Sequence, residues 1–136
     1  MRIYWDSCVV IYRIQQVAPW HSVIAGMLEP ILDTTALHVS HLTRLECRVY
    51  PIRKIDLSLL KRFDEFFARP DVRVVAARPD VFDLATELRA LHNVRTPDAL
   101  HLACAISAEC DEFWTSDRRL AQAAVGRIKI VTVDAP

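Results

Sequence analysis

The sequence lacks the long apolar run that a membrane-spanning helix requires. Such a helix needs ~20 consecutive apolar residues, and polar side chains interrupt the most apolar N-terminal stretch at Arg13, His21, Glu29 and Asp33. A signal peptide is not expected either, because Asp6 follows Arg2 closely and the stretch has no small-residue cleavage site. We therefore expect a cytoplasmic protein without a membrane partner.

Glycine and cysteine are both scarce. The 2 glycines and 7 prolines exclude a low-complexity chain, and a content of 52% hydrophobic and 25% charged residues excludes a disordered one. The 4 cysteines form no Cys-x-x-Cys pair, so we expect small core residues in a reducing compartment. At 136 residues the chain has the length of one domain, and we expect a single domain over 1–136.

The chain also has no net charge, so any binding to nucleic acid must come from a local patch. Among the 17 basic residues, 14 are arginine, whose planar guanidinium suits bidentate contacts with phosphate. A GC-rich genome produces the same bias without any function. Both interpretations stay open.

Patterns typical of strands and helices alternate along the whole sequence. The predicted strands are 2–6, 37–40, 72–76, 113–116 and 128–133. The predicted helices are 7–16, 20–32 with a bend or early end at Pro30, 41–50, 56–68, 79–92, 96–110 and 117–124. This order favours an α/β fold with a parallel sheet covered on both faces, and such sheets bind ligands at the carboxyl ends of their strands.

Two aspartates directly follow predicted strands. Asp6 ends the first strand and Asp117 follows the fourth, at the edge where a parallel sheet binds its ligand. Each could instead cap the helix that follows, a role worth ~1 kcal/mol. Thr115 or Ser116 could serve equally as the cap of the second helix. For each aspartate taken alone, helix capping and cation binding both remain open.

Glu46 lies on a predicted helix beside an apolar stripe that we expect to face the core. The stripe consists of Leu42, Leu45 and Val49. An ionised carboxylate at that border is costly unless it is paired or metal-bound, and the alternative is a surface position. Arg44 and Arg48 should point elsewhere on the helix, which we expect to end at Pro51.

Asp98 belongs to a helix start in which Thr96 is the expected cap and Pro97 the first helical residue. Free backbone N–H groups and the helix dipole keep such an aspartate ionised, and an ionised carboxylate is a ready metal ligand. Placement at the dipole explains a single aspartate without any ligand. It does not explain why an acidic start belongs to a helix that otherwise looks buried.

The four carboxylates can meet at one edge of the sheet. Carboxylate oxygens suit magnesium or manganese, and two such ions ~4 Å apart can activate a water and stabilise the leaving oxygen in phosphodiester cleavage. We therefore predict a metal-dependent nuclease. Its catalytic and metal-binding residues would be Asp6, Glu46, Asp98 and Asp117.

Four motifs resemble those of the PIN-domain family, and within it the VapC-type toxins of toxin–antitoxin pairs. They are Ile3-Tyr4-Trp5-Asp6-Ser7, Leu42-Thr43-Arg44-Leu45-Glu46, the segment 95–103 that contains Thr96-Pro97-Asp98-Ala99-Leu100-His101, and Trp114-Thr115-Ser116-Asp117 with the residues that follow. The resemblance covers essentially the whole chain. It implies a three-layer α/β/α fold with strand order 3-2-1-4-5 and the same four acids as ligands of Mg²⁺ or Mn²⁺.

By the same resemblance, the protein would be an endoribonuclease toxin and a homodimer. A small VapB-type antitoxin would hold it inactive, with the antitoxin's C-terminal segment in the acidic groove. The apolar helices predicted at 20–32 and 56–68 also favour a dimer, because their apolar faces need not all be covered within one chain. A housekeeping PIN nuclease, a metal-dependent phosphatase and a non-catalytic module that binds RNA or protein remain open as alternatives.

The resemblance also suggests roles for side chains near the acids. Ser7 would assist beside Asp6, whereas Cys8 stands where family members often carry Ser or Asn. For His101 we expect hydrogen bonds that hold its helix or its neighbours, and not general acid catalysis. The candidates for RNA contacts are Ser7, Arg44, Arg48, Arg95, Arg118 and Arg119. For each arginine taken separately, a solvated surface position remains the default explanation.

Overall fold

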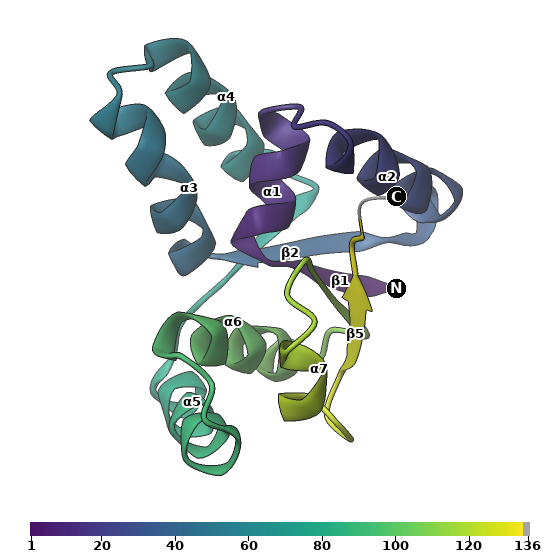
Figure 1. Ribbon diagram of the computed structural model, residues 1–136, viewed down its shortest axis with the longest axis vertical. Coiled ribbons are helices and arrows are strands. Elements are labelled where there is room, and N and C mark those ends of the chain that lie inside the picture. The colour runs from purple at the N-terminus through teal and green to yellow at the C-terminus, as the bar shows by residue number, and fades with distance from the viewer. Residues whose placement is uncertain (135–136) are drawn as a thin grey trace.

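A five-stranded parallel sheet forms the centre of the protein (Figure 1). The computed structural model describes residues 1–134. Its strands are β1 (Arg2–Trp5), β2 (Ala36–Ser40), β3 (Val72–Val75), β4 (Glu112–Thr115) and β5 (Lys129–Thr132). Every neighbouring pair is parallel, and the order is β3-β2-β1-β4-β5. The predicted α/β fold and its strand order are confirmed.

Helices cover both faces of the sheet (Figure 1). One face carries α1 (Ser7–Ile14), α2 (Trp20–Leu28), the 3-10 helix η1 (Glu29–Thr34), α3 (His41–Arg53) and α4 (Leu57–Phe67). The other carries α5 (Pro79–His92), α6 (Thr96–Ser107) and α7 (Leu120–Ala123). Successive strand residues point to opposite faces, so Tyr4 packs with α6 while Trp5 packs with α1 and α4. None of the helices described over 1–134 combines the length and apolarity of a membrane span.

Pro51 does not end α3, contrary to the prediction. The helix continues to Arg53, and the N–H of the capping residue Lys54 still bonds to the carbonyl oxygen of Tyr50. Proline lacks an N–H and normally breaks a helix interior. Here its ring is buried, and this apolar burial offsets the lost backbone bond.

The predicted core stripe of α3 is also wrong. Leu45 and Val49 are 59% and 41% exposed, whereas Thr43, Cys47 and Pro51 are buried. Residues four apart share one face of a helix. The cause lies at the start of α3, where Ser40 and Thr43 form a reciprocal capping box and turn Thr43 toward the sheet. Leu45 and Val49 are thereby left exposed, whereas Leu42 is half-buried.

The α6 helix differs from the prediction at both ends. Arg95, and not Thr96, is the N-cap, and it makes no side-chain cap bond; Thr96 is the first helical residue. The helix ends at Ser107 because Glu109 adopts a left-handed backbone conformation with φ of 56°. As predicted, α6 is largely buried. Its buried residues are Ala99, His101, Leu102, Ala103, Cys104 and Ala105.

The remaining elements lie close to their predicted positions. Pro30 lies in η1, which follows the early end of α2 at Leu28, as expected from its effect on a helix. The helix predicted at 117–124 is shorter, since α7 covers only Leu120–Ala123. All four cysteines are free, and the predicted role as small core residues is confirmed for Cys47, Cys104 and Cys110, whereas Cys8 is only partly buried.

Candidate active site

Asp6 lies at the carboxyl end of the central strand β1. One carboxylate oxygen, Oδ1, accepts the N–H of Ser7 at 2.8 Å and so caps α1. The other, Oδ2, accepts the hydroxyl of Thr115 at 2.8 Å. Burial raises the pKa of this carboxyl group, although His101 and Thr115 oppose the shift. Asp6 is therefore both a helix cap and a buried carboxylate that would gain from a cation.

Glu46 lies on α3 and faces Asp6 across the start of α1. Its Oε1 accepts the hydroxyl of Ser7 at 2.7 Å and lies 2.5 Å from Nε2 of His101. Burial raises the pKa of Glu46, but the hydrogen bonds of His101 and Ser7 together outweigh it, so that the pKa is lowered. Ser7 thus contacts both acids through different atoms, its N–H and its hydroxyl.

His101 joins these two acids from the opposite layer of helices. It is 1% exposed, and its Nε2 lies 3.7 Å from Oδ1 of Asp6 as well as beside Glu46. Its Nδ1 lies 2.8 Å from the hydroxyl oxygen of Tyr4. These contacts agree with the hydrogen-bonding role expected for this histidine.

Asp98 and Asp117 are held in a different way, by arginines of their own chain segments. Arg95 pairs with Asp98 at 3.1 Å, and Arg119 pairs with Asp117 at 2.8 Å. The arginine side chains are 72% and 78% exposed, so these are surface ion pairs of little strength. The hydrogen bond from Arg119 lowers the pKa of Asp117.

Thr115 links the two pairs of acids. Its hydroxyl oxygen donates to Asp6 and accepts the N–H of Asp117 at 3.1 Å. The charge of Asp98 contributes to the raised pKa of Asp6, and Arg95 contributes to the lowered pKa of both Glu46 and Asp117. Hydrogen bonds through Ser7, His101 and Thr115 thus connect Asp6 with Glu46 and Asp117 at the carboxyl ends of β1 and β4, and Asp98 acts on Asp6 through its charge. We call the region of these four carboxylates the acidic crevice.

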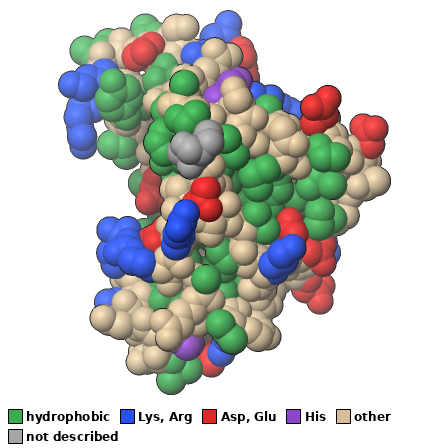
Figure 2. Space-filling view, turned by 45° about the vertical axis from the view of Figure 1, so that its right-hand side comes forward, with side chains coloured by type: hydrophobic (Ala, Val, Ile, Leu, Met, Phe, Trp, Pro, Cys, Tyr) green, Lys and Arg blue, Asp and Glu red, His purple; other side chains and the backbone are tan. Residues whose placement is uncertain are grey.

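The acidic crevice is not a closed metal centre. Among residues 1–134, no three His, Cys, Asp or Glu side chains converge closely enough to hold an ion. The all-oxygen donor set nevertheless fits magnesium or manganese. Asp6 and Glu46 are already oriented by hydrogen bonds, whereas Asp98 pairs with Arg95 through one oxygen and Asp117 pairs with Arg119 through both. Figure 2 shows acidic side chains recessed between the two helical layers, with basic side chains beside them.

The other arginines named as candidates for RNA contacts lie farther from the acids. Arg44 and Arg48 lie 3.8 Å and 2.8 Å from Asp64 of α4, and so point away from Glu46 as expected. Arg118 pairs with Asp134 at 2.8 Å. Of the five arginines, only Arg95 and Arg119 contact carboxylates of the acidic crevice.

Sequence reasoning missed the contributions of Tyr4 and Thr115. Tyr4 lies two residues before Asp6 and therefore on the same face of β1, a spacing that could have pointed to its hydroxyl. Thr115 was considered only as a helix cap. Its bond to Asp6 depends on β4 lying beside β1, with Trp5 in register with Trp114. Cys8 also contacts this region, because Ser116 donates its N–H and hydroxyl to the Cys8 sulfur.

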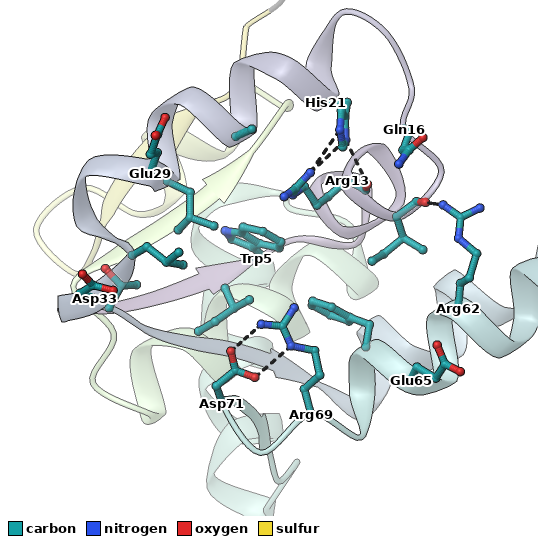
Figure 3. A pocket seen from close by; sticks show the side chains of 17 residues that line it. Trp5, Arg13, Gln16, His21, Glu29, Asp33, Arg62, Glu65, Arg69 and Asp71 are labelled. Atoms are coloured by element: carbon teal, nitrogen blue, oxygen red, sulfur yellow. Dashed lines mark hydrogen bonds and ion pairs between the residues drawn. The ribbon is translucent and has the colours of Figure 1, made fainter.

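A cavity of about 1080 Å³ lies apart from the acids, among α1, α2, η1 and α4 (Figure 3). Trp5 forms part of its apolar lining, and the indole N–H of Trp5 is buried without a hydrogen-bond partner among the described residues. Charged side chains also line the cavity. Arg69 pairs with Asp71, and Arg13 lies 3.2 Å from both ring nitrogens of His21.

Solved structures of low sequence identity share this fold. A structure of VapBC2 from Rickettsia felis bound to a DNA fragment from their promoter gives a TM-score of 0.79 at 16% identity, covering 98% of this chain and 100% of the other. A toxin–antitoxin complex from Klebsiella pneumoniae gives a TM-score of 0.74 at 17% identity, covering 98% of this chain and 99% of the other. FitAcB from Neisseria gonorrhoeae gives a TM-score of 0.71 at 14% identity, covering 96% of each chain.

Comparisons of the sequence with known proteins and with family models identify the family of the chain. No curated protein matches the chain significantly. The family model of the PIN domain matches residues 3–126, which include all four acids of the acidic crevice. With this match over nearly the whole chain, and with the parallel sheet of order β3-β2-β1-β4-β5, the protein belongs to the PIN-domain family.

Proposed function

We propose that this protein is a Mg²⁺- or Mn²⁺-dependent endoribonuclease and the toxin of a type II toxin–antitoxin pair. The observation that carries the proposal is the buried Asp6 at the end of β1, with Glu46, Asp98 and Asp117 around it. Membership of the PIN-domain family supports the nuclease activity. The structural neighbours from toxin–antitoxin systems support the biological role.

A divalent cation bound by the four acids would supply a polarised water and neutralise the charge of the scissile phosphate. The residues of the chain would hold the carboxylates that bind this cation. Ser7, Thr115 and His101 hold Asp6 and Glu46 in place through hydrogen bonds. Arg95 and Arg119, the exposed partners of Asp98 and Asp117, would offer positive charge to RNA phosphates at the rim of the acidic crevice.

The proposed protein partner is a small VapB-type antitoxin. The neighbour from Klebsiella pneumoniae is a toxin–antitoxin complex, and the one from Rickettsia felis is a VapBC assembly. An antitoxin segment with a positively charged side chain would be complementary to the acidic crevice.

A homodimer is also proposed. The exposed apolar side chains, however, lie mainly outside the helices predicted at 20–32 and 56–68. Only Leu32 and Leu57 are highly exposed within 20–32 and 56–68, at 55% and 70%. A larger number of exposed apolar side chains lies on α3 and the turn that follows it. They are Leu45, Val49, Tyr50, Ile52 and Ile55. Light scattering at micromolar concentration tests the dimer, and a monomeric mass would contradict it.

The nuclease proposal is tested by incubating the purified protein with total RNA, with and without magnesium or manganese, and mapping new 5′ ends. We expect cleavage only with metal, and none from Asp98→Asn, which keeps the size of the side chain but removes its charge. Hydrolysis of a chromogenic phosphate ester without cleavage of RNA would instead indicate a phosphatase. Binding of RNA that stays intact would indicate a non-catalytic module.

A further inference from the structure

The hydroxyl of Tyr4 is a buried junction between three elements of the fold. The residue is fully buried in β1, and its hydroxyl donates to Oγ of Ser40 at 2.8 Å. The same oxygen lies 3.3 Å from Oγ1 of Thr43 and 2.8 Å from Nδ1 of His101. One atom thus connects the central strand with the capping box of α3 and with α6.

From this junction, a continuous chain of hydrogen bonds leads to Glu46. His101 is bonded at both ring nitrogens, by Tyr4 at Nδ1 and by Glu46 at Nε2. The ring therefore cannot turn without breaking one of the two bonds. At the far end, Oε1 of Glu46 accepts from both Ser7 and His101, which leaves its other oxygen for a cation.

The carboxylate of Glu46 needs such support more than that of Asp6 does. Asp6 has a short side chain that is held by the backbone N–H of Ser7 and by Thr115. Glu46 has one more rotatable bond, and its side chain is 33% exposed compared with 12% for Asp6. Without a fixed imidazole, only the hydroxyl of Ser7 would hold its carboxylate. The affinity of a metal site depends on this kind of orientation by residues behind the ligands.

We propose that Tyr4 is a positioning residue that acts through His101 to orient Glu46, and thereby sets the affinity of the acidic crevice for a divalent cation. The inference rests on the proposed metal site. The hydroxyl can be separated from the packing of the ring, because the Tyr4 ring stacks on Phe113 with centroids 5.3 Å apart and planes 8° apart. Tyr4→Phe keeps that stack and removes only the junction.

The test is the dissociation constant of Mn²⁺, obtained from the electron paramagnetic resonance signal of the free ion. We expect Tyr4→Phe to bind manganese ~10-fold more weakly than the parent, the lower end of the effect of residues behind metal ligands. Tyr12→Phe is the matched control, since Tyr12 stacks on Trp20 in the other layer and lies outside this chain of bonds. It should bind manganese as the parent does.

A double-mutant cycle separates positioning from a general loss of stability. His101→Gln keeps an amide donor that can reach Glu46 but breaks the link to Tyr4, so Tyr4→Phe should cost no further affinity in that background. A merely structural role of Tyr4 would lower the melting temperature by similar amounts in both backgrounds and leave the dissociation constant unchanged. If Tyr4→Phe does not fold, His101→Gln alone tests the same link and should weaken binding.

The outcomes distinguish the two levels of the proposal. Equal manganese affinity of the parent and Tyr4→Phe, or additive losses in the double mutant, would overturn the role of Tyr4 and leave the metal site standing. A parent protein that leaves manganese free at millimolar concentration would overturn the metal site and the positioning role together.

Discussion

The acidic crevice has an inner and an outer half that are built by different means. Asp6 and Glu46, the inner pair, are held by hydrogen bonds from Ser7, Thr115 and His101, mostly between residues distant in the sequence. Asp98 and Asp117, the outer pair, are each held by an exposed arginine two or three residues away. The inner half is thus preorganised by the fold. In the outer half, each carboxylate is paired with an exposed arginine side chain, and solvent can compete with that ion pair.

The largest effect is expected from removing a charge from the outer half. Asp98→Asn should reduce RNA cleavage by ~10²–10³-fold or more, the range for removing one electrostatic group from an active site. The fold should persist, because asparagine keeps the size of the side chain and α6 is stabilised mainly by burial. Cleavage assays and circular dichroism check both statements. A variant that cuts RNA within a few fold of the parent would remove Asp98 from the site.

The next effect concerns whether the two halves bind one ion together. Metal that binds only the folded protein adds ~2.7 kcal/mol at a hundred times its dissociation constant. At pH 7.5, millimolar manganese should therefore raise the melting temperature of the parent by several degrees relative to EDTA. Asp6→Asn and Asp117→Asn should each gain much less. Equal gains in all three proteins would show that the two halves do not share a metal.

A smaller effect is expected from pH in the absence of metal. Burial raises the pKa of Asp6, so its protonated form stabilises the fold below the usual carboxyl pKa, and this contribution is lost as pH rises through the raised value. Asp117 has a lowered pKa, so its contribution is present at neutral pH and is lost on acidification through that lowered value.

The two aspartates should therefore differ in EDTA. Asp6→Asn should melt above the parent at pH 7, and the gain should shrink toward pH 4. Asp117→Asn should show no such gain. Melting curves of the three proteins across this interval measure the contrast, and the same response to both substitutions would mean that inner and outer acids are not electrostatically distinct.

The smallest effect is expected from the arginines of the outer half. Arg119→Ala should leave the melting temperature nearly unchanged, because its ion pair with Asp117 is exposed and screened by salt. Manganese should bind slightly more tightly, since the cation no longer displaces an arginine, whereas the KM for RNA should rise through the loss of a phosphate contact. Arg127→Ala, which removes an ion pair with Glu87 and concerns no candidate for RNA contacts, is the control. A KM that rises equally in both variants would argue against a special role of Arg119.

The parallel sheet and the carboxylates at its edge were accessible from local patterns in the sequence, whereas the strand order followed only from the resemblance to the PIN-domain family. Alternating strand and helix signals predict a parallel sheet, and a carboxylate directly after a strand lies at the ligand-binding edge of such a sheet. The pairs Arg95–Asp98 and Arg119–Asp117 are equally local, since each joins residues within one turn of chain. The sequence analysis nevertheless named Arg95 and Arg119 only as candidates for RNA contacts and not as partners of these acids.

The rotation of α3 and the support of Glu46 were decided only by the tertiary structure. The sequence pattern favoured Leu45 and Val49 as core residues, but the capping box of α3 turned Thr43 and Cys47 inward. The bonds from Tyr4 through His101 to Glu46 join residues 55 to 97 positions apart. No periodicity along one segment carries such information, because those distances exist only when the sheet has brought β1, α3 and α6 together.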